Sequence, residues 1–310
     1  MDRRSVMMNG LWRGLVMAAV WIAATYALRY ALRGLDWPVF RAHLVTLDWR
    51  WVGLAVAFDI ASYVAQGVRW RLLLAGASVW QTTRAIYAGL FINELVPFRP
   101  GEAIRAWLAA RDLHVTVWNI LPTMVTERVI DGIWLAVALL SALAAVPLPQ
   151  TVVSAVRILI PAIAVLLPVV LFFGRFSSWM QTAVIGLRNP KVVAVSGCFL
   201  VSQGLAFWAT GRASHLHLNL LAAFVVMLIV RLGTLLPGAP ANLGTHQFST
   251  VLGLSLYGVS QPDAATFSVI VFAVLTIPLC LVGLVASLSS GLTLHNMRQP
   301  IQHMRQPIQP

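Results

Sequence analysis

Three long runs without a charged residue decide what this chain can fold into. They cover residues 192–211, 232–262 and 264–294, and none of them contains Asp, Glu, Lys or Arg. A helix of about 20 apolar residues crosses the hydrocarbon core of a bilayer, so runs of this kind predict membrane-spanning helices. A transmembrane β-barrel would instead show alternating segments of about ten residues. We therefore expect an all-α, polytopic integral membrane protein.

The charge composition agrees with this class. Only 10% of the 310 residues are charged and 59% are hydrophobic, whereas an ordinary soluble domain carries about 25% charged residues. The formal net charge is +12, but basic residues of a membrane protein gather in its loops and near anionic headgroups. The sequence offers no soluble basic domain, so we expect no nucleic-acid partner. Cys198 and Cys280 lie in apolar runs without a metal or disulfide pattern, and we expect no metal or other cofactor.

Charges, prolines and glycines divide the chain into candidate spans. We expect about seven, near residues 12–31, 51–73, 117–147, 153–173, 192–211, 214–236 and 264–289. Two further apolar segments, 83–98 and 237–260, are short or interrupted by Pro and Gly. We interpret them as broken or re-entrant helices, because such backbone is tolerated at membrane depth only where protein or water covers it. Residues 1–294 then form a single membrane domain, and the repetitive, Pro-rich tail at 295–310 is expected to be disordered.

The first broken segment carries charges that a lipid-facing helix would avoid. Glu94 has apolar neighbours, and Arg99, Glu102 and Arg105 follow closely. Ionisable groups inside a bilayer are costly and normally face a cavity or a site. Pro100 suits the first turn of a helix, the free N–H groups of a helix start attract an anion, and the flanking arginines suit phosphate. The alternative is an interfacial cluster that only anchors the helix.

A second charged cluster consists of Glu127, Arg128 and Asp131. Their spacing allows all three side chains to face one side of a helix. Two carboxylates so close to each other repel, so Arg128 or a proton must neutralise one of them. The cluster is either part of a substrate or proton site, or a structural ion pair that joins two helices.

The third segment, residues 236–247, contains two prolines and two glycines. These residues prevent a regular helix before Thr245, where a short helix can resume and point the positive end of its dipole into the membrane. Segments interrupted by Pro and Gly in both halves of a chain are typical of a transporter's binding site.

The candidate substrate-binding residues come from these three segments: Asn93, Glu94, Arg99, Glu102, Arg105, Glu127, Arg128, Asp131, Asn242, Gly244 and Gln247. A further polar face in the second span, formed by Asp59, Tyr63, Gln66 and Arg69, is more typical of a contact between helices. We expect no catalytic residue, because the sequence has no nucleophile elbow, no phosphate-binding loop with Lys and no zinc pattern.

A series of landmarks runs along the chain in a fixed order: Arg69-Trp70-Arg71-Leu72-Leu73-Leu74, Gly89, Asn93, Pro97, Arg99, Gly101-Glu102, Arg105, Glu127-Arg128, Asp131, the turn from Pro240 to Gln247, and Gly258. In these residues the chain resembles the lysylphosphatidylglycerol synthase transmembrane region, also called the flippase-like domain. The resemblance runs from about residue 51 to residue 288. Ala241 replaces a Gly that is usual in the family and Gln247 replaces a Glu, which argues against a role that needs negative charge there. The soluble aminoacyl-transferring domain of the full-length synthases is absent from this sequence.

The resemblance implies a flippase-like transporter of a lipid or lipid-linked substrate in the inner (cytoplasmic) membrane. In this interpretation Arg99, Arg105 and Arg128 bind an anionic headgroup in a polar cavity, and the neighbouring carboxylates position these arginines or carry protons. Two alternatives stay open. One is a membrane-embedded transferase that acts on a lipid-linked substrate, and the other is a membrane scaffold for a lipid or glycan biosynthetic enzyme as partner.

Overall fold

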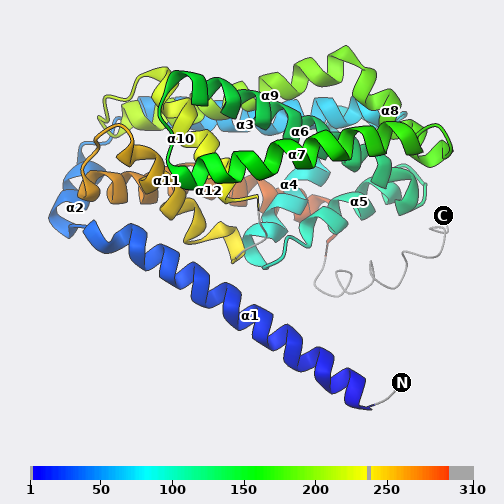
Figure 1. The fold of residues 1–310 in the computed structure, drawn as a ribbon, viewed down its shortest axis with the longest axis horizontal. Helices are drawn as coiled ribbons and strands as arrows, with labels where there is room; N and C mark the ends of the chain where they lie inside the picture. Colours follow the sequence, from blue (N-terminus) through cyan, green and yellow to red (C-terminus); the bar gives the residue numbers. More distant parts are fainter. Residues whose placement is uncertain (1–2, 236–238, 293–310) are drawn as a thin grey trace.

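The structure, a computed structural model, describes residues 3–235 and 239–292. All regular elements of these residues are helices (Figure 1). The expected all-α, polytopic class is therefore confirmed. The expectation for the tail at 295–310 falls outside the described residues, and the single membrane domain at 1–294 stays a prediction.

Five helices of the described chain are long and apolar enough to cross a membrane. They are α3 (Trp49–Leu73), α6 (Val117–Ala145), α7 (Gln150–Phe173), α9 (Pro190–Ala213) and α12 (Gln261–Ser289). Each coincides with one of the spans expected from the sequence. α6 continues through Pro122 as one helix, and α3 packs most extensively against α9.

One of the other two expected spans differs from the prediction. The span at 214–236 is replaced by α10 (Leu220–Gly233) of 14 residues, which is about 21 Å long and shorter than the roughly 30 Å hydrocarbon core. The span at 12–31 falls within α1 (Arg3–Ala31), a single helix of 29 residues. α1 extends away from the helical bundle in Figure 1 and contacts α11 and the short helix η1 (Leu32–Gly34), which leads to α2 (Trp37–Val45).

Two pairs of short helices occupy the broken segments of the sequence. The first pair is α4 (Val79–Leu95) and α5 (Gly101–Asp112), which pack against each other. The second pair is α10 and α11 (Thr245–Ser255), which also pack together and are joined through the short helix η2 (Pro240–Asn242). α4 contacts η2, and α12 contacts both α4 and α11. The two helical hairpins therefore meet inside the bundle, and whether the segments 83–98 and 237–260 re-enter the membrane stays a prediction.

A close approach of two glycines allows the first hairpin to form. A Cβ atom on Gly101 would lie 1.8 Å from the carbonyl oxygen of Gly89, and a Cβ atom on Gly89 would lie 2.6 Å from the carbonyl oxygen of Gly101. No side chain fits between the two backbones at these distances. α5 is thereby held directly against α4, and the residues that connect the two helices are fixed in place.

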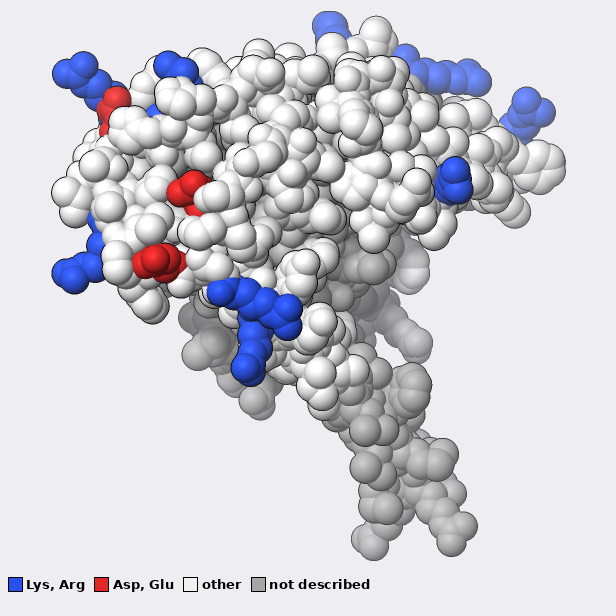
Figure 2. Space-filling model, turned by 60° about the vertical axis from the view of Figure 1, so that its left-hand side comes forward, with Lys and Arg blue, Asp and Glu red and all other residues white. Residues whose placement is uncertain are grey.

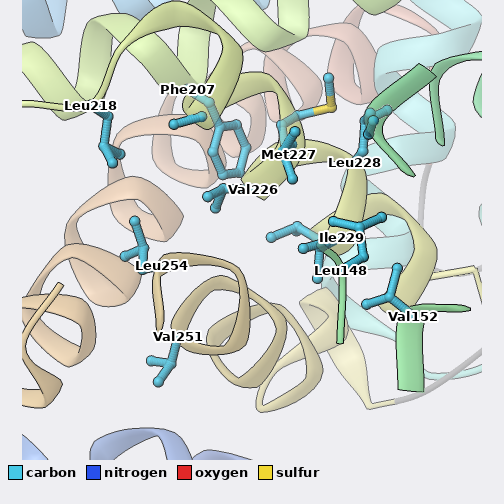
Figure 3. Packing of buried hydrophobic residues seen from close by; sticks show 14 of the residues in the cluster. Leu148, Val152, Phe207, Leu218, Val226, Met227, Leu228, Ile229, Val251 and Leu254 are labelled. Atoms are coloured by element: carbon cyan, nitrogen blue, oxygen red, sulfur yellow. The ribbon is translucent and has the colours of Figure 1, made fainter. Parts of the chain in front are cut away.

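The largest hydrophobic cluster surrounds α10. Figure 3 shows the side chains of Val226, Met227 and Ile229 packed with residues from neighbouring elements. Phe207 comes from α9 and Leu254 from α11, and both are at most 5% exposed. α10 is thus surrounded by protein on several sides, which explains how a helix too short to cross the bilayer alone is accommodated at its depth.

The face of the molecule in Figure 2 is mainly uncharged. On the face shown in Figure 2, white uncharged side chains form most of the surface, and charged side chains lie mainly toward its margins. α8 (Ser178–Arg188) packs against α6, α7 and α9. Large hydrophobic side chains such as Ile158, Val165 and Phe172 are exposed on α7. Apolar side chains that face lipid are the expected surface of a membrane-spanning bundle.

Candidate functional site

A cavity of about 500 Å³ lies between the helices and is lined by α3 to α7 and α9 to α12. Much of its lining is polar, although the surrounding helices are apolar. The polar lining residues are Asp59, Tyr63, Gln66, Arg69, Asn93, Glu94, Arg99, Glu102, Arg105, Glu127, Arg128, Asp131, Gln203, Arg231, Thr234, Asn242, His246 and Thr276. The three charged or broken segments that the sequence analysis singled out therefore come together around one cavity.

Two of the candidate residues do not line this cavity: Gly244 and Gln247. The side-chain oxygen of Gln247 accepts the backbone N–H of Gly244 at 2.8 Å and so caps the start of α11. A Cβ atom on Gly244, whose φ is 87°, would meet the backbone of Ala24 in α1 at 2.1 Å. In this structure both residues hold α11 in place. The remaining nine candidates line the cavity.

Arg69 is the centre of a buried ion cluster. Its guanidinium group donates to Glu127 at 3.1 and 3.0 Å, to both carboxylate oxygens of Asp131, and to the hydroxyl of Ser196 at 3.2 Å. Arg69 and Glu127 are at most 2% exposed. The cluster joins α3, α6 and α9. The expected neutralisation of one carboxylate by Arg128 or a proton is thus corrected, because Arg69 from another helix neutralises both.

Arg105 and Arg128 extend this cluster toward α5. Arg105 donates to Glu127 at 2.6 Å, lies 3.5 Å from Glu102, and stacks 4.6 Å above the ring of Trp70. Arg128 pairs with Glu102. Burial raises the pKa of the Glu102 carboxyl, but Arg105 and Arg128 lower it by more, so this pKa lies below its ordinary value. The predicted pairing of Glu102 with Arg105 is confirmed, and Arg128 reaches across to α5.

The start of α5 is not open to an anion in the way the sequence suggested. α5 begins at Gly101, directly after Pro100, as expected. The backbone N–H of Gly101, however, donates to the side-chain oxygen of Asn93 at 2.8 Å. Asn93 therefore satisfies one of the orphan donors of the helix and connects α4 to α5. This contact corrects the expectation of a free N–H group at Gly101.

The tips of the two helical hairpins touch each other through Arg99. Its guanidinium group donates to the backbone oxygen of Thr234 and lies 3.5 Å from the side-chain oxygen of Asn242. Arg99 has φ 53°, its neighbour Phe98 has φ 65°, and Asn242 has φ 50°. A residue other than Gly in such a conformation costs about 1–3 kcal/mol, and such strain is concentrated at functional sites.

The polar face of α3 lines the cavity in addition to packing against neighbouring helices. The Asp59 carboxylate, on a residue only 4% exposed, makes no ion pair and accepts no side-chain hydrogen bond from the described residues. Glu94 on α4 likewise has no ion-pair partner among them. The polar residues around Asp59 are typical of a contact between helices in the sequence, and their place in the cavity emerges only from the structure. His246 also lines the cavity, but the described part of the chain contains no cluster of His, Cys, Asp and Glu that would hold a metal ion.

Arg231 also lines the cavity, although it is not among the substrate-binding residues predicted from the sequence. It lies near the end of α10, donates to the side-chain oxygen of Gln203, and stacks 4.6 Å above the ring of Phe199. A signal for it was present in the sequence, because Arg231 is the one charge between Arg212 and Asp263. A lone arginine in so long an apolar stretch is expected to face a cavity.

Comparison with known proteins identifies a family. The model of the lysylphosphatidylglycerol synthase TM region family matches residues 14–283. This range includes every cavity-lining residue named above. No curated protein and no solved structure matches the chain significantly.

Proposed function

Because this chain belongs to the lysylphosphatidylglycerol synthase transmembrane-region family, we propose that it moves a lipid or lipid-linked substrate with an anionic headgroup across the cytoplasmic membrane. One observation carries the proposal. Five arginines and five carboxylates from different helices line a single cavity inside a bundle whose long helices suit a bilayer. Ionisable groups at membrane depth mark pathways for polar substrates.

The size of the cavity suits a headgroup. About 500 Å³ lies within the range of roughly 300–1,000 Å³ that is typical of small-molecule sites. The polar headgroup would occupy the cavity, and the acyl chains would remain in the bilayer. With the headgroup in the cavity and the acyl chains in the bilayer, the lipid avoids the large free-energy cost of placing a charged headgroup in hydrocarbon.

α7 is the wall beside which the lipid would pass. Leu159, Ala162 and Ile163 line the cavity from α7, and only three residues of this helix are buried. Val165 and other large side chains on the same helix are exposed. α7 thus presents apolar side chains both to the polar cavity and to the outer surface.

Translocation is tested with protein reconstituted into vesicles that contain a fluorescent phosphatidylglycerol. Dithionite quenches only the outer leaflet, so an active protein raises the quenched fraction above that of protein-free vesicles. Quenching equal to that of protein-free vesicles would refute the proposal. Mass spectrometry of the recovered lipid covers the transferase alternative, for which a chemically altered product is expected.

A matched pair of variants on α7 tests the role of the cavity. Ala162→Trp places a large side chain at the cavity, whereas Val165→Trp places the same side chain on the exposed surface, where Val165 is 65% exposed. We expect Ala162→Trp to slow lipid exchange and Val165→Trp to leave it unchanged. Equal rates for the two variants would contradict passage through this cavity.

A further inference from the structure

The structure distinguishes two kinds of arginine in the cavity, and we propose that Arg99 and Arg231 bind the phosphate of the headgroup as a phosphodiester site. Arg69, Arg105 and Arg128 instead hold the helices around the cavity together. This assignment rests on the proposed function, which it deepens by naming the residues and the ligand chemistry of the site.

The first kind of arginine is already neutralised. Arg69 pairs with Glu127 and Asp131, Arg105 with Glu127 and Glu102, and Arg128 with Glu102. Three guanidinium groups therefore face three carboxylates. A phosphate that approached any of them would compete with carboxylates that are already in contact and would meet their repulsion.

Arg99 and Arg231 form the second kind. Neither makes an ion pair with a carboxylate of the described residues. Their hydrogen-bond partners are neutral oxygens, which belong to Thr234 and Asn242 for Arg99 and to Gln203 for Arg231. Both arginines line the cavity. Both side chains are half-buried, and a half-buried cation without an ion pair is partly desolvated, so an anionic ligand in the cavity would find its strongest partners here.

The two arginines approach the cavity from different hairpins but reach the same end of α10. Arg99 follows α4 and donates to the backbone oxygen of Thr234. The hydroxyl of Thr234 in turn donates to the backbone oxygen of Arg231 at 3.2 Å. The Arg231 guanidinium itself extends to Gln203 and Phe199 of α9, so the two guanidinium groups enter the same cavity from different elements, and each retains N–H donors for a phosphate.

The remaining charges of the cavity favour a singly charged ligand. Asp59 and Glu94 line the same cavity and make no ion pair with the described residues. Ionised carboxylates at these positions repel additional negative charge. A phosphodiester carries one negative charge, whereas a phosphate monoester carries about 1.5 to 2 at neutral pH. The site is therefore expected to prefer a phosphodiester headgroup to phosphatidic acid or inorganic phosphate.

The assignment is tested by native mass spectrometry of the detergent-purified full chain, titrated with dioctanoyl phosphatidylglycerol. We expect Arg99→Gln and Arg231→Gln to raise the Kd at least tenfold, since each removes a charge-assisted hydrogen bond. Arg212→Gln is the matched control, because Arg212 is exposed, lies outside the cavity lining and stacks on Trp51. Its Kd should stay within twofold of the wild-type value. If Arg231→Gln does not fold, Arg231→Lys replaces it, which keeps the charge, loses the planar fork and should still raise the Kd about threefold.

Three results would overturn the assignment. One is wild-type affinity in both Arg99→Gln and Arg231→Gln, and another is an equally large loss in Arg128→Gln. The third is displacement of the lipid by inorganic phosphate at equal concentration, which would identify a site for free phosphate. Dioctanoyl phosphatidic acid should bind more weakly than phosphatidylglycerol, and dioctanoyl glycerol should not compete. If the wild type exchanges lipid in vesicles but Arg99→Gln and Arg231→Gln bind the lipid with wild-type affinity, the assignment of the two arginines fails and the proposed function stands. If the wild-type protein neither exchanges lipid in vesicles nor binds it in detergent, both the assignment and the proposed function are refuted.

Discussion

Glu127→Gln is the substitution that tests the ion cluster most directly. The Glu127 carboxylate accepts hydrogen bonds from Arg69 at 3.1 and 3.0 Å and from Arg105 at 2.6 Å, and the residue is 1% exposed. Glutamine has nearly the same shape but no charge. The substitution leaves two buried guanidinium groups in contact with a neutral side chain, with Asp131 as the main remaining counter-ion of Arg69.

The expected loss of stability is large. Breaking a buried ion pair by removing one partner costs about 3–5 kcal/mol, because the other charge stays buried without compensation. The amide oxygen of the substituted side chain still accepts one hydrogen bond, so we expect a value near the lower end, about 3 kcal/mol. Glu102→Gln serves as comparison, because Glu102 is 30% exposed, its partner Arg128 is 54% exposed, and its second partner Arg105, at 3.5 Å, keeps Glu127 as a counter-ion. Solvent screens the Glu102–Arg128 pair, and the substitution should cost no more than about 1 kcal/mol.

The free energy of unfolding is measured by titrating each protein in dodecylmaltoside with sodium dodecyl sulfate and following far-UV circular dichroism. We expect Glu127→Gln to unfold at a clearly lower fraction of sodium dodecyl sulfate than Glu102→Gln. A Glu127→Gln protein as stable as the wild type would refute the structural role of the cluster. Equal losses in the two variants would show that burial does not govern the strength of these pairs.

Three further predictions use the same measurement. Gly101→Ala forces a methyl group against the backbone of Gly89 and should lower the free energy of unfolding by more than about 2 kcal/mol. The control Gly53→Ala, where a Cβ meets nothing within 4 Å, should be neutral or slightly stabilising. Similar effects of the two substitutions would disprove the close approach of Gly101 to Gly89. Asp59→Asn removes a buried carboxylate without an ion pair and should leave the free energy of unfolding unchanged or raise it by about 1 kcal/mol. A clear loss of stability would show that a cation pairs with the Asp59 carboxylate. Asn93→Ala removes the acceptor for the Gly101 N–H and should cost about 1 kcal/mol, and an unchanged value would contradict this contact.

The class of the fold and most of the residues around the cavity followed from local patterns. Long uncharged runs predict the five long helices, since each helix is encoded by a contiguous stretch. Pro100 and the Pro/Gly segment before Thr245 predict two helix starts that the structure places at Gly101 and Thr245. Charges inside apolar segments then indicate which helices face the cavity.

The partners of these charges did not follow from the sequence. Spacing within a helix suggests contacts three or four residues apart, but Glu127 is held by Arg69, which is 58 residues away. Gln247 lies in the right segment and yet turns back to cap its own helix. The length of α10 was overestimated because Asn219 caps its start within an apolar stretch. These outcomes depend on tertiary packing, which a single sequence does not reveal.

The separation of Arg69 from its partners also constrains how the chain is made. Glu127 emerges from the ribosome 58 residues after Arg69, which corresponds to roughly 3 to 12 seconds at synthesis rates of about 5–20 residues per second. During that interval the arginine near the end of α3 has no counter-charge from α6, so its release into lipid would be costly. The insertion machinery must therefore retain α3, or leave its end at the aqueous border, until α6 arrives and the two helices enter the bilayer as a unit.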